Sequence, residues 1–232
     1  MTGRIHSVQS LGAVDGPGLR GVVFFQGCPL RCAYCHNPDT WGFEGGRETD
    51  VEALVKRLLR CRSYYKNGGV TASGGEPLMQ SEFVSALFAR LREEGIHTAL
   101  DTSGMAPDGA AERVLPHTDL VICDLKFPTD ELYRRHTGMP MQPVLDFLAA
   151  AERRNIPLWI RHVVVPGLTD SEEEVSAIAS LAQQYGNLEK IELLPFKKLC
   201  LSKYRALNIP FPLETTPECP PERIEKLSGL LI

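Results

Sequence analysis

Residues 21–35 read GVVFFQGCPLRCAYC, and the interpretation of the chain starts from this stretch. Gly21 to Gln26 is a short apolar run of the kind that forms a buried strand. Directly after it, Cys28, Cys32 and Cys35 place three thiols within eight residues. In α/β proteins the chemistry lies in loops at the carboxyl ends of parallel strands. The stretch therefore predicts an α/β fold whose chemistry begins in the loop after this strand.

Further apolar stretches follow, and helical patterns separate several of them. We expect strands at residues 21–26, 70–73, 96–101, 119–125, 158–165 and 190–194, and helices beginning near residues 51, 83, 144, 175 and 221. The expected helix boundaries are two capping boxes, Thr49 with Glu52 and Ser171 with Glu174, an N-cap at Ser81 and a stop at Gly95. Such repeats predict parallel strands with helices outside them, as in a partial barrel or a doubly wound open sheet.

The length of 232 residues suits one domain. We expect a single-domain α/β fold, a partial (β/α)6 TIM-like barrel over residues 20–195. A strand and loop at residues 1–19 precede it, and an extension with a final helix at residues 196–232 follows it. Six strand-helix units are too few to close an eight-stranded barrel.

The composition excludes several classes of protein. The net charge of −4 gives no basic face for nucleic acid. No apolar run reaches the roughly 18 to 20 residues that span a bilayer, and residues 1–10 lack the apolar core of a signal peptide. We therefore expect a cytoplasmic protein with neither a nucleic-acid nor a membrane partner. Seven cysteines in a chain of this length favour metal or redox chemistry over a disulfide framework.

The spacing C-x3-C-x2-C at Cys28, Cys32 and Cys35 has two chemical interpretations. A structural zinc ion needs four protein ligands, and the nearby His36 is awkwardly placed because it directly follows Cys35. An iron–sulfur cluster is also held by thiolates, usually four. Three cysteines leave one iron open, which is useful when a further molecule binds there, so the pattern favours a catalytic cluster.

These cysteines, with Tyr34 before the last of them, resemble the motif of the radical S-adenosylmethionine (SAM) superfamily. Further segments resemble the glycyl-radical activases of that superfamily, especially those that activate pyruvate formate-lyase. They are Val14–Arg20 (VDGPGLR), Cys35–Trp41 (CHNPDTW), Gly69–Pro77 (GVTASGGEP), Asp101–Gly104 (DTSG), Asp124–Lys126 (DLK) and Val163–Gly167 (VVVPG). Many other activases carry a cysteine-rich insert after the cluster loop, whereas residues 37–70 here contain only Cys61.

The resemblance implies an activity, its cofactors and its partners. A [4Fe-4S] cluster on Cys28, Cys32 and Cys35 would bind SAM at its open iron, cleave it reductively, and form a 5′-deoxyadenosyl radical. That radical would abstract a hydrogen atom from a glycine of pyruvate formate-lyase, in anaerobic glucose metabolism. A low-potential donor such as flavodoxin or ferredoxin would supply the electron, and the chain would act as a monomer. Activation of another glycyl radical enzyme is the alternative.

The resemblance also implies binding residues. The expected SAM contacts are Tyr34, Cys35, His36, Gly74, Gly75, Glu76, Asp124, Leu125, Lys126, Arg161 and Lys197. Asp101 and Thr102 are expected to bind a monovalent cation, and Asp15, Gly16 and Arg20 to contact the partner's glycine-bearing loop. Other interpretations stay open. Asp124 with Lys126 is also a plausible buried ion pair, Arg161 a salt bridge inside the barrel, and the Asp15 segment a plain turn.

Position 197 departs from the pattern, because the family usually has a histidine there. Lysine donates hydrogen bonds but cannot accept them. Either Lys197 or backbone groups would then replace the histidine. The remaining cysteines (Cys61, Cys123, Cys200 and Cys219) and histidines (His6, His97, His117, His136 and His162) are interpreted as structural.

Overall fold

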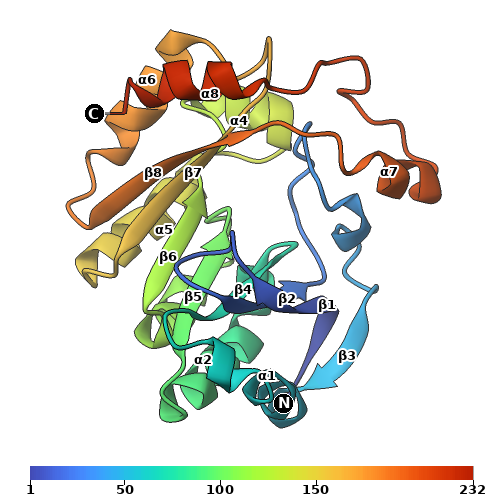
Figure 1. Ribbon diagram of the computed structural model, residues 1–232, viewed down its shortest axis with the longest axis vertical. Helices are drawn as coiled ribbons and strands as arrows, with labels where there is room; N and C mark the ends of the chain where they lie inside the picture. The colour runs from blue at the N-terminus through green and yellow to red at the C-terminus, as the bar shows by residue number, and fades with distance from the viewer. Residues whose placement is uncertain (232) are drawn as a thin grey trace.

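One sheet of eight strands organises the computed structural model, which describes residues 1–231 (Figure 1). Six of its strands are parallel: β2 (Arg20–Phe25), β4 (Gly69–Gly74), β5 (His97–Thr102), β6 (Leu120–Asp124), β7 (Leu158–Val164) and β8 (Leu188–Pro195). All six agree with the predicted strands to within a residue or two.

The strand order decides between the two folds that periodicity left open. Each parallel strand pairs with the parallel strand before it in the chain, so the order β2-β4-β5-β6-β7-β8 never reverses. A doubly wound sheet contains such a reversal. Figure 1 shows the strands curving into a wall with helices outside it. The two ends of the sheet, β3 and β8, do not pair with each other, so the predicted partial barrel is confirmed.

The N-terminal edge of the sheet is antiparallel. β1 (Thr2–Gly12) pairs with β2 on one side and with β3 (Arg47–Asp50) on the other. β1 agrees with the strand predicted within residues 1–19, whereas β3 was not predicted from the sequence. The four residues of β3 read RETD and are mostly exposed, so they carry none of the apolar alternation by which a strand is recognised.

The α-helices are α1 (Val51–Leu59), α2 (Ser81–Glu93), α3 (Ala110–Val114), α4 (Asp130–Thr137), α5 (Gln142–Arg153), α6 (Glu172–Ala182), α7 (Leu201–Leu207) and α8 (Pro221–Ser228). The five predicted helices are α1, α2, α5, α6 and α8. The other three, α3, α4 and α7, were not predicted; each is short, with five to eight residues, and each buries few side chains, so no apolar helical repeat stands out.

Two of the predicted helix caps are wrong. Asp50 rather than Thr49 caps α1, because its side chain accepts hydrogen bonds from the Glu52 and Ala53 amides. Ser81 is the first residue of α2 and directly follows a 3-10 turn, so it caps nothing. The other two predictions are confirmed. Ser171 accepts a hydrogen bond from the Glu174 amide at the start of α6, and Gly95 follows α2 at a positive φ of 70°.

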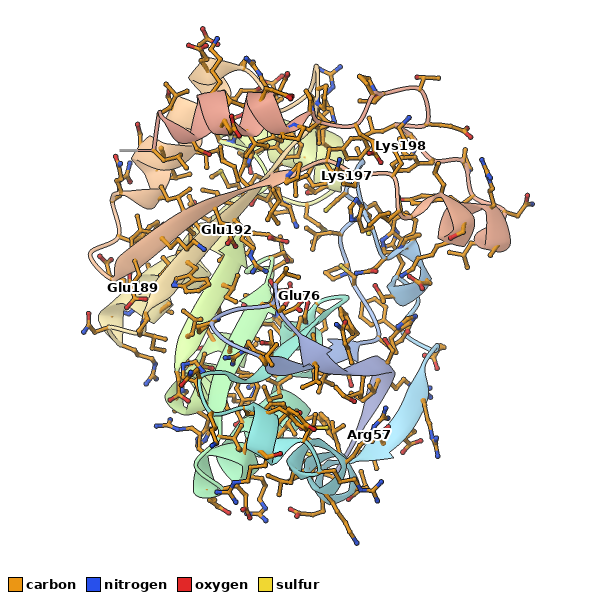
Figure 2. The ribbon with its side chains drawn as sticks, in the orientation of Figure 1. Arg57, Glu76, Glu189, Glu192, Lys197 and Lys198 are labelled. Carbon is orange, nitrogen blue, oxygen red and sulfur yellow. The ribbon has the colours of Figure 1, made fainter. Side chains whose placement is uncertain are left out.

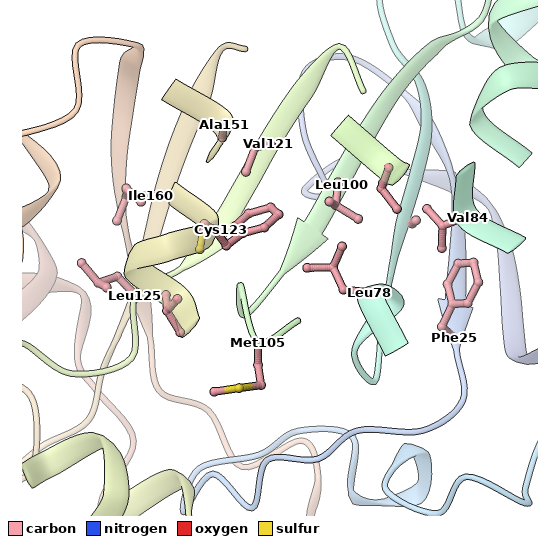
Figure 3. Close-up of a cluster of buried hydrophobic side chains, with 14 of the residues drawn as sticks. Phe25, Leu78, Val84, Leu100, Met105, Val121, Cys123, Leu125, Ala151 and Ile160 are labelled. Atoms are coloured by element: carbon pink, nitrogen blue, oxygen red, sulfur yellow. The ribbon is translucent and has the colours of Figure 1, made fainter. Parts of the chain in front are cut away.

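Alternation along each strand separates the core from the inside of the barrel. Val121 and Cys123 of β6 point into the apolar layer between sheet and helices, where both are fully buried (Figure 3). Ile122, from the intervening position, belongs to a separate small cluster with Ala99 and Leu120. Asp124 lies two residues after Ile122 on β6, so it points to the same face of the sheet as Ile122. Its carboxylate is therefore directed toward the inside of the barrel.

Candidate active site

The cysteine loop after β2 is closed by backbone hydrogen bonds. The amide of Gly27 donates to the carbonyl of Thr40 at 2.8 Å, and that of Cys28 donates to the carbonyl of Trp41 at 3.3 Å. Gly27 has φ +94°, and a Cβ there would meet the Phe43 ring at 2.6 Å. The backbone therefore turns sharply just before Cys28, and the loop returns to its starting point at Trp41.

The three thiols of the loop are free and partly buried. Burial, as the largest cause, raises the pKa of Cys28 and of Cys32 to about 12, and it also raises the pKa of Cys35. Metal binding here must therefore displace protons. Within residues 1–231, no three His, Cys, Asp or Glu side chains converge on one ion position. An iron–sulfur cluster does not need three ligands that converge on one ion, because each cysteine binds a different iron. Three thiolates are soft ligands and suit iron–sulfur ligation.

The glycine turn after β4 packs directly on the start of the cysteine loop. The amide of Gly75 donates to the carbonyl of Phe25, and that of Glu76 to the carbonyl of Gly27, both at 2.9 Å. A Cβ on Gly75 would meet the Gly27 oxygen at 2.4 Å, so only glycine allows this approach. The amides of Gly75 and Glu76 already donate hydrogen bonds within the protein, so they are not free to bind a ligand. The carbonyl oxygens of the turn can accept hydrogen bonds from an ammonium group.

Glu76, predicted to contact SAM, is an internal clamp. Its fully buried carboxylate accepts hydrogen bonds from the Thr102 hydroxyl at 2.6 Å, from the Ser103 hydroxyl at 2.5 Å, and from the amides of Ser103 and Leu78 at 2.9 and 3.0 Å. Burial nevertheless raises the pKa of this carboxyl. The side chain thus holds the end of β5 against the glycine turn, and its carboxylate oxygens are both engaged within the protein; a SAM contact of Glu76 stays a prediction.

Asp101 and Asp124 bring two carboxylates to neighbouring strand ends. Asp101 accepts a hydrogen bond from Ser73 Oγ at 2.6 Å. Burial, followed by repulsion from Asp124, raises the pKa of Asp101 to about 6. A cation between the two would relieve this repulsion. The hydroxyl of Thr102, the other predicted cation ligand, donates to Glu76 at 2.6 Å and accepts from the Gly104 amide at 2.9 Å, so it supports the turn after β5.

Asp124 and Lys126 form a close ion pair, with Nζ and Oδ2 2.5 Å apart. The Lys126 backbone is fixed as well, since its amide donates to Tyr133 Oη at 2.9 Å and its carbonyl accepts from Tyr34 Oη at 3.4 Å. Tyr34 itself is only 4% exposed, so it reaches this segment from within the core. Burial is the largest single influence and lowers the pKa of Lys126, but the attraction and hydrogen bond of Asp124, together with the charges of Cys32 and Tyr34, raise it further than burial lowers it, which keeps the ammonium charged.

Leu125, also predicted to contact SAM, is held on both sides. Its amide donates to the Arg161 carbonyl at 2.9 Å, its carbonyl accepts from His162 Nδ1 at 2.9 Å, and its side chain is buried in the core (Figure 3). Leu125 therefore fixes the backbone between Asp124 and Lys126, and its contact with SAM stays a prediction. His162, interpreted as structural, belongs to this support.

Arg161 is engaged in salt bridges inside the barrel, one of the two interpretations that the sequence left open. Its Nε donates to Glu192 Oε2 at 2.8 Å, Nη2 donates to the carbonyl of Val14 at 2.5 Å, and Nη1 lies 3.9 Å from Asp101. Arg161 therefore joins β7 and β8 to the loop between β1 and β2.

That loop, residues 13–19, lies against the inside of the barrel. Thr71 of β4 donates to the carbonyl of Asp15 at 2.7 Å, and a Cβ on Gly16 would lie 3.3 Å from Ile122 of β6. Arg20, predicted to contact the partner, is fully buried. Its guanidinium donates to Thr71 Oγ1 at 2.7 Å and to the carbonyls of Pro17 and Val70 at 3.1 and 3.0 Å. Arg20 thus fixes the loop through the carbonyl of Pro17. Because Arg20 is fully buried, it cannot itself contact a partner in this conformation.

His36 connects the cysteine loop to the segment that leaves β8. Its Nε2 donates to the carbonyl of Lys197 at 2.7 Å. The Lys197 side chain turns away, with Nζ 3.3 Å from Glu218 and 41% of its area exposed. Figure 2 shows Lys197 beside Lys198 on this segment. The backbone at position 197 therefore faces the site, whereas the lysine side chain lies toward solvent.

Sequence reasoning missed the supporting side chains. Tyr133, Ser103 and Trp41 hold the predicted motifs in place, but none was predicted as a site residue. Ser103 and Trp41 carried a signal, since they lie in the Asp101–Gly104 and Cys35–Trp41 segments that resembled the family, whereas Tyr133 lies in neither.

Comparison with known proteins gives a consistent result. The family model described as the Radical SAM superfamily matches residues 22–178. The chain is 48% identical to a pyruvate formate-lyase-activating enzyme of Clostridium pasteurianum, over 99% of this chain and 97% of that protein. It is 42% identical to the pyruvate formate-lyase 1-activating enzyme of Escherichia coli K12, over 99% and 95%.

Among solved structures, the chain resembles a radical SAM methyltransferase from Sphaerobacter thermophilus with a TM-score of 0.66 and 17% identity, over 99% of this chain and 74% of that one. It also resembles a domain of a pyruvate-formate lyase-activating enzyme from Bacteroides vulgatus, with a TM-score of 0.57 and 23% identity, over 71% and 93%. At these identities the likeness concerns the fold.

Proposed function

Because the chain belongs to the radical SAM superfamily and, within it, to the pyruvate formate-lyase-activating enzymes, we propose that Cys28, Cys32 and Cys35 hold the [4Fe-4S] cluster with which it activates pyruvate formate-lyase. One observation carries this assignment. The cysteine loop, the Gly74–Gly75 turn and the Asp124–Lys126 pair lie at the carboxyl ends of β2, β4 and β6, all at the same end of the six parallel strands. Three thiolates suit the cluster and leave one iron open to SAM.

When bound, the reduced cluster would supply one electron to SAM, whose sulfur–C5′ bond would break to give methionine and the 5′-deoxyadenosyl radical, and this radical would become 5′-deoxyadenosine by taking a hydrogen atom from a glycine Cα of pyruvate formate-lyase. The residues of the chain bind and orient these groups. The carbonyl oxygens of Gly74 and Gly75 accept from the SAM amino group. The Lys126 ammonium donates to SAM beside Asp124, and the carboxylates of Asp101 and Asp124 attract a monovalent cation.

Access for the partner's glycine comes from the inside of the barrel. Asp15 and Gly16 lie there, anchored through the carbonyls of Val14, Asp15 and Pro17. With the backbone fixed in this way, the loop forms a firm surface against which a glycine-bearing segment can rest. Burial, as the largest cause, raises the pKa of Asp15.

Three further features belong to this proposal. A low-potential electron donor such as flavodoxin or ferredoxin reduces the cluster, the chain acts as a monomer, and the reaction takes place in the cytoplasm. The seven free cysteines suit a reducing compartment. Within residues 1–231 no helix is both long and apolar enough to cross a membrane.

Anaerobic reconstitution with iron and sulfide tests the cluster assignment. We expect about four irons and four sulfides per chain, and formation of 5′-deoxyadenosine when SAM and a reductant are added. Bound zinc in anaerobically purified protein, or an iron-loaded chain that leaves SAM intact, would overturn it.

A further inference from the structure

Helix α4 contacts two segments that the proposed function brings together, the cysteine loop and the segment that follows β6. The last carbonyls of a helix have no partner within it, and two of those in α4 bind the cysteine loop. The amide of Arg31 donates to the carbonyl of Thr137 at 2.8 Å, and that of Ala33 donates to the carbonyl of His136 at 2.9 Å. The C-terminal end of α4 therefore fixes the middle of the cysteine loop.

The same helix holds the segment that carries Lys126. Tyr133 of α4 is fully buried, and its Oη accepts a hydrogen bond from the Lys126 amide at 2.9 Å. The Tyr133 ring also meets the ring of Phe127 edge-on, with centroids 6.1 Å apart. Phe127 is fully buried as well, and its centroid lies 6.1 Å from that of Tyr34 in the cysteine loop. One hydrogen bond and two ring contacts thus connect this segment to α4 and to the cysteine loop.

We propose that α4 sets the position of the Lys126 ammonium relative to the cluster, and that Tyr133 is the positioning residue through which it does so. The inference rests on the proposed function, because it takes the loop cysteines as cluster ligands and Lys126 as a SAM contact. Tyr133 acts through the Lys126 backbone, which it holds from within the core. A side chain on a fixed backbone loses less freedom when it binds a ligand, so this support favours SAM binding.

Two buried tyrosines give a matched pair of variants. Tyr133→Phe removes the hydroxyl that accepts from Lys126 and keeps the ring. Tyr204→Phe makes the same change on α7, where the buried Oη makes no hydrogen bond within residues 1–231. In anaerobic SAM titrations at wild-type iron and sulfide content, we expect the dissociation constant for SAM to rise about two- to tenfold in Tyr133→Phe, the equivalent of one hydrogen bond. Tyr204→Phe should bind SAM as tightly as the wild type.

Amide hydrogen exchange of the metal-free chain, followed by NMR, separates positioning from a general loss of stability. In Tyr133→Phe the Lys126 amide loses its acceptor and should exchange faster than in the wild type. The amides of Arg31 and Ala33 keep their acceptors at the end of α4, so they should exchange at the wild-type rate. Equally faster exchange of all three amides would show a purely structural role and would overturn the proposal.

Wild-type SAM affinity in a Tyr133→Phe variant that carries a full cluster would overturn it as well. A wild-type chain that binds no cluster would instead refute the proposed function, so the two failures are distinct.

A second measurement uses the wild-type holoenzyme and decides the matter if Tyr133→Phe loses its cluster. Coupling between two sites is reciprocal, so SAM binding should slow hydrogen exchange in α4. Mass spectrometry of peptides that cover α4 measures this, and α1, which packs against α2 and β3, serves as the control with an unchanged rate. Exchange in α4 that SAM leaves unchanged would overturn the proposal.

Discussion

The three cysteines of the loop after β2 differ in role from the other four. Cys28, Cys32 and Cys35 lie in one closed loop, whereas Cys61 follows α1. We predict that alanine at any of the three loop positions abolishes SAM cleavage, because each thiolate binds its own iron. Cys61→Ala, measured by iron content and 5′-deoxyadenosine production, should match the wild type. Loss of the cluster in the Cys61 variant would mean that the ligand set is wrong.

The Glu76 clamp predicts a large effect on stability. Both of its carboxylate oxygens accept hydrogen bonds, from Thr102, Ser103 and Leu78. In Glu76→Gln the amide NH2 meets donors instead of acceptors, so we expect the free energy of unfolding to fall by about 3 kcal/mol. Urea denaturation of the metal-free protein measures this. Glu82→Gln, an exposed position on α2, should change it by no more than about 0.5 kcal/mol.

Lys197 replaces the usual histidine, yet its side chain pairs with Glu218 while its carbonyl receives His36. We therefore predict that Lys197→Ala still cleaves SAM, and that Lys197→His remains active with SAM affinity changed no more than about two- to tenfold, the equivalent of one hydrogen bond. Anaerobic SAM titration and 5′-deoxyadenosine production measure both. An intact cluster without cleavage in Lys197→Ala would show that the lysine itself is essential.

The loop between β1 and β2 depends on Arg20 for its position. The buried guanidinium binds the carbonyl of Pro17 and the hydroxyl of Thr71, which in turn binds the carbonyl of Asp15. We predict that Arg20→Met releases the loop and lowers activation of pyruvate formate-lyase at least tenfold, while SAM cleavage without the partner changes less. The exposed Arg60→Met serves as the control. If Arg20→Met lost SAM cleavage and activation of pyruvate formate-lyase to the same extent, that result would contradict a role of this loop in holding the partner.

The parallel strands and the motifs at their ends could be predicted from the sequence, because buried strands such as β2 and β7 are largely apolar runs. What could not be predicted is the burial of charged residues whose partners come from distant segments. Glu76 and Arg20 are enclosed by partners from distant segments, and no local pattern encodes those partners. The polar strand β3 was missed for the same reason, since its pairing with β1 decides its structure.

The whole molecule is a barrel that stays open between β8 and the N-terminal edge of the sheet. The segment after β8 crosses this opening, and α7 reaches the cysteine loop, where Lys203 Nζ binds Asn37 Oδ1 at 2.8 Å and Asp39 Oδ1 at 3.0 Å (Figure 1). The N-terminal and C-terminal parts of the chain therefore meet around the candidate cluster. On the loop side, the site is closed by these contacts between the segment that follows the cysteine loop and α7.

We propose that this molecule places a radical on a glycine of pyruvate formate-lyase. The most direct test incubates the reconstituted chain anaerobically with pyruvate formate-lyase, SAM and a reductant, and records the electron paramagnetic resonance spectrum of the partner. We predict a glycyl radical signal, with the doublet splitting of a single α-hydrogen, that requires SAM and is absent with Cys32→Ala. No signal on pyruvate formate-lyase from a chain that carries its cluster and cleaves SAM, or a signal only on another glycyl radical enzyme, would contradict the account.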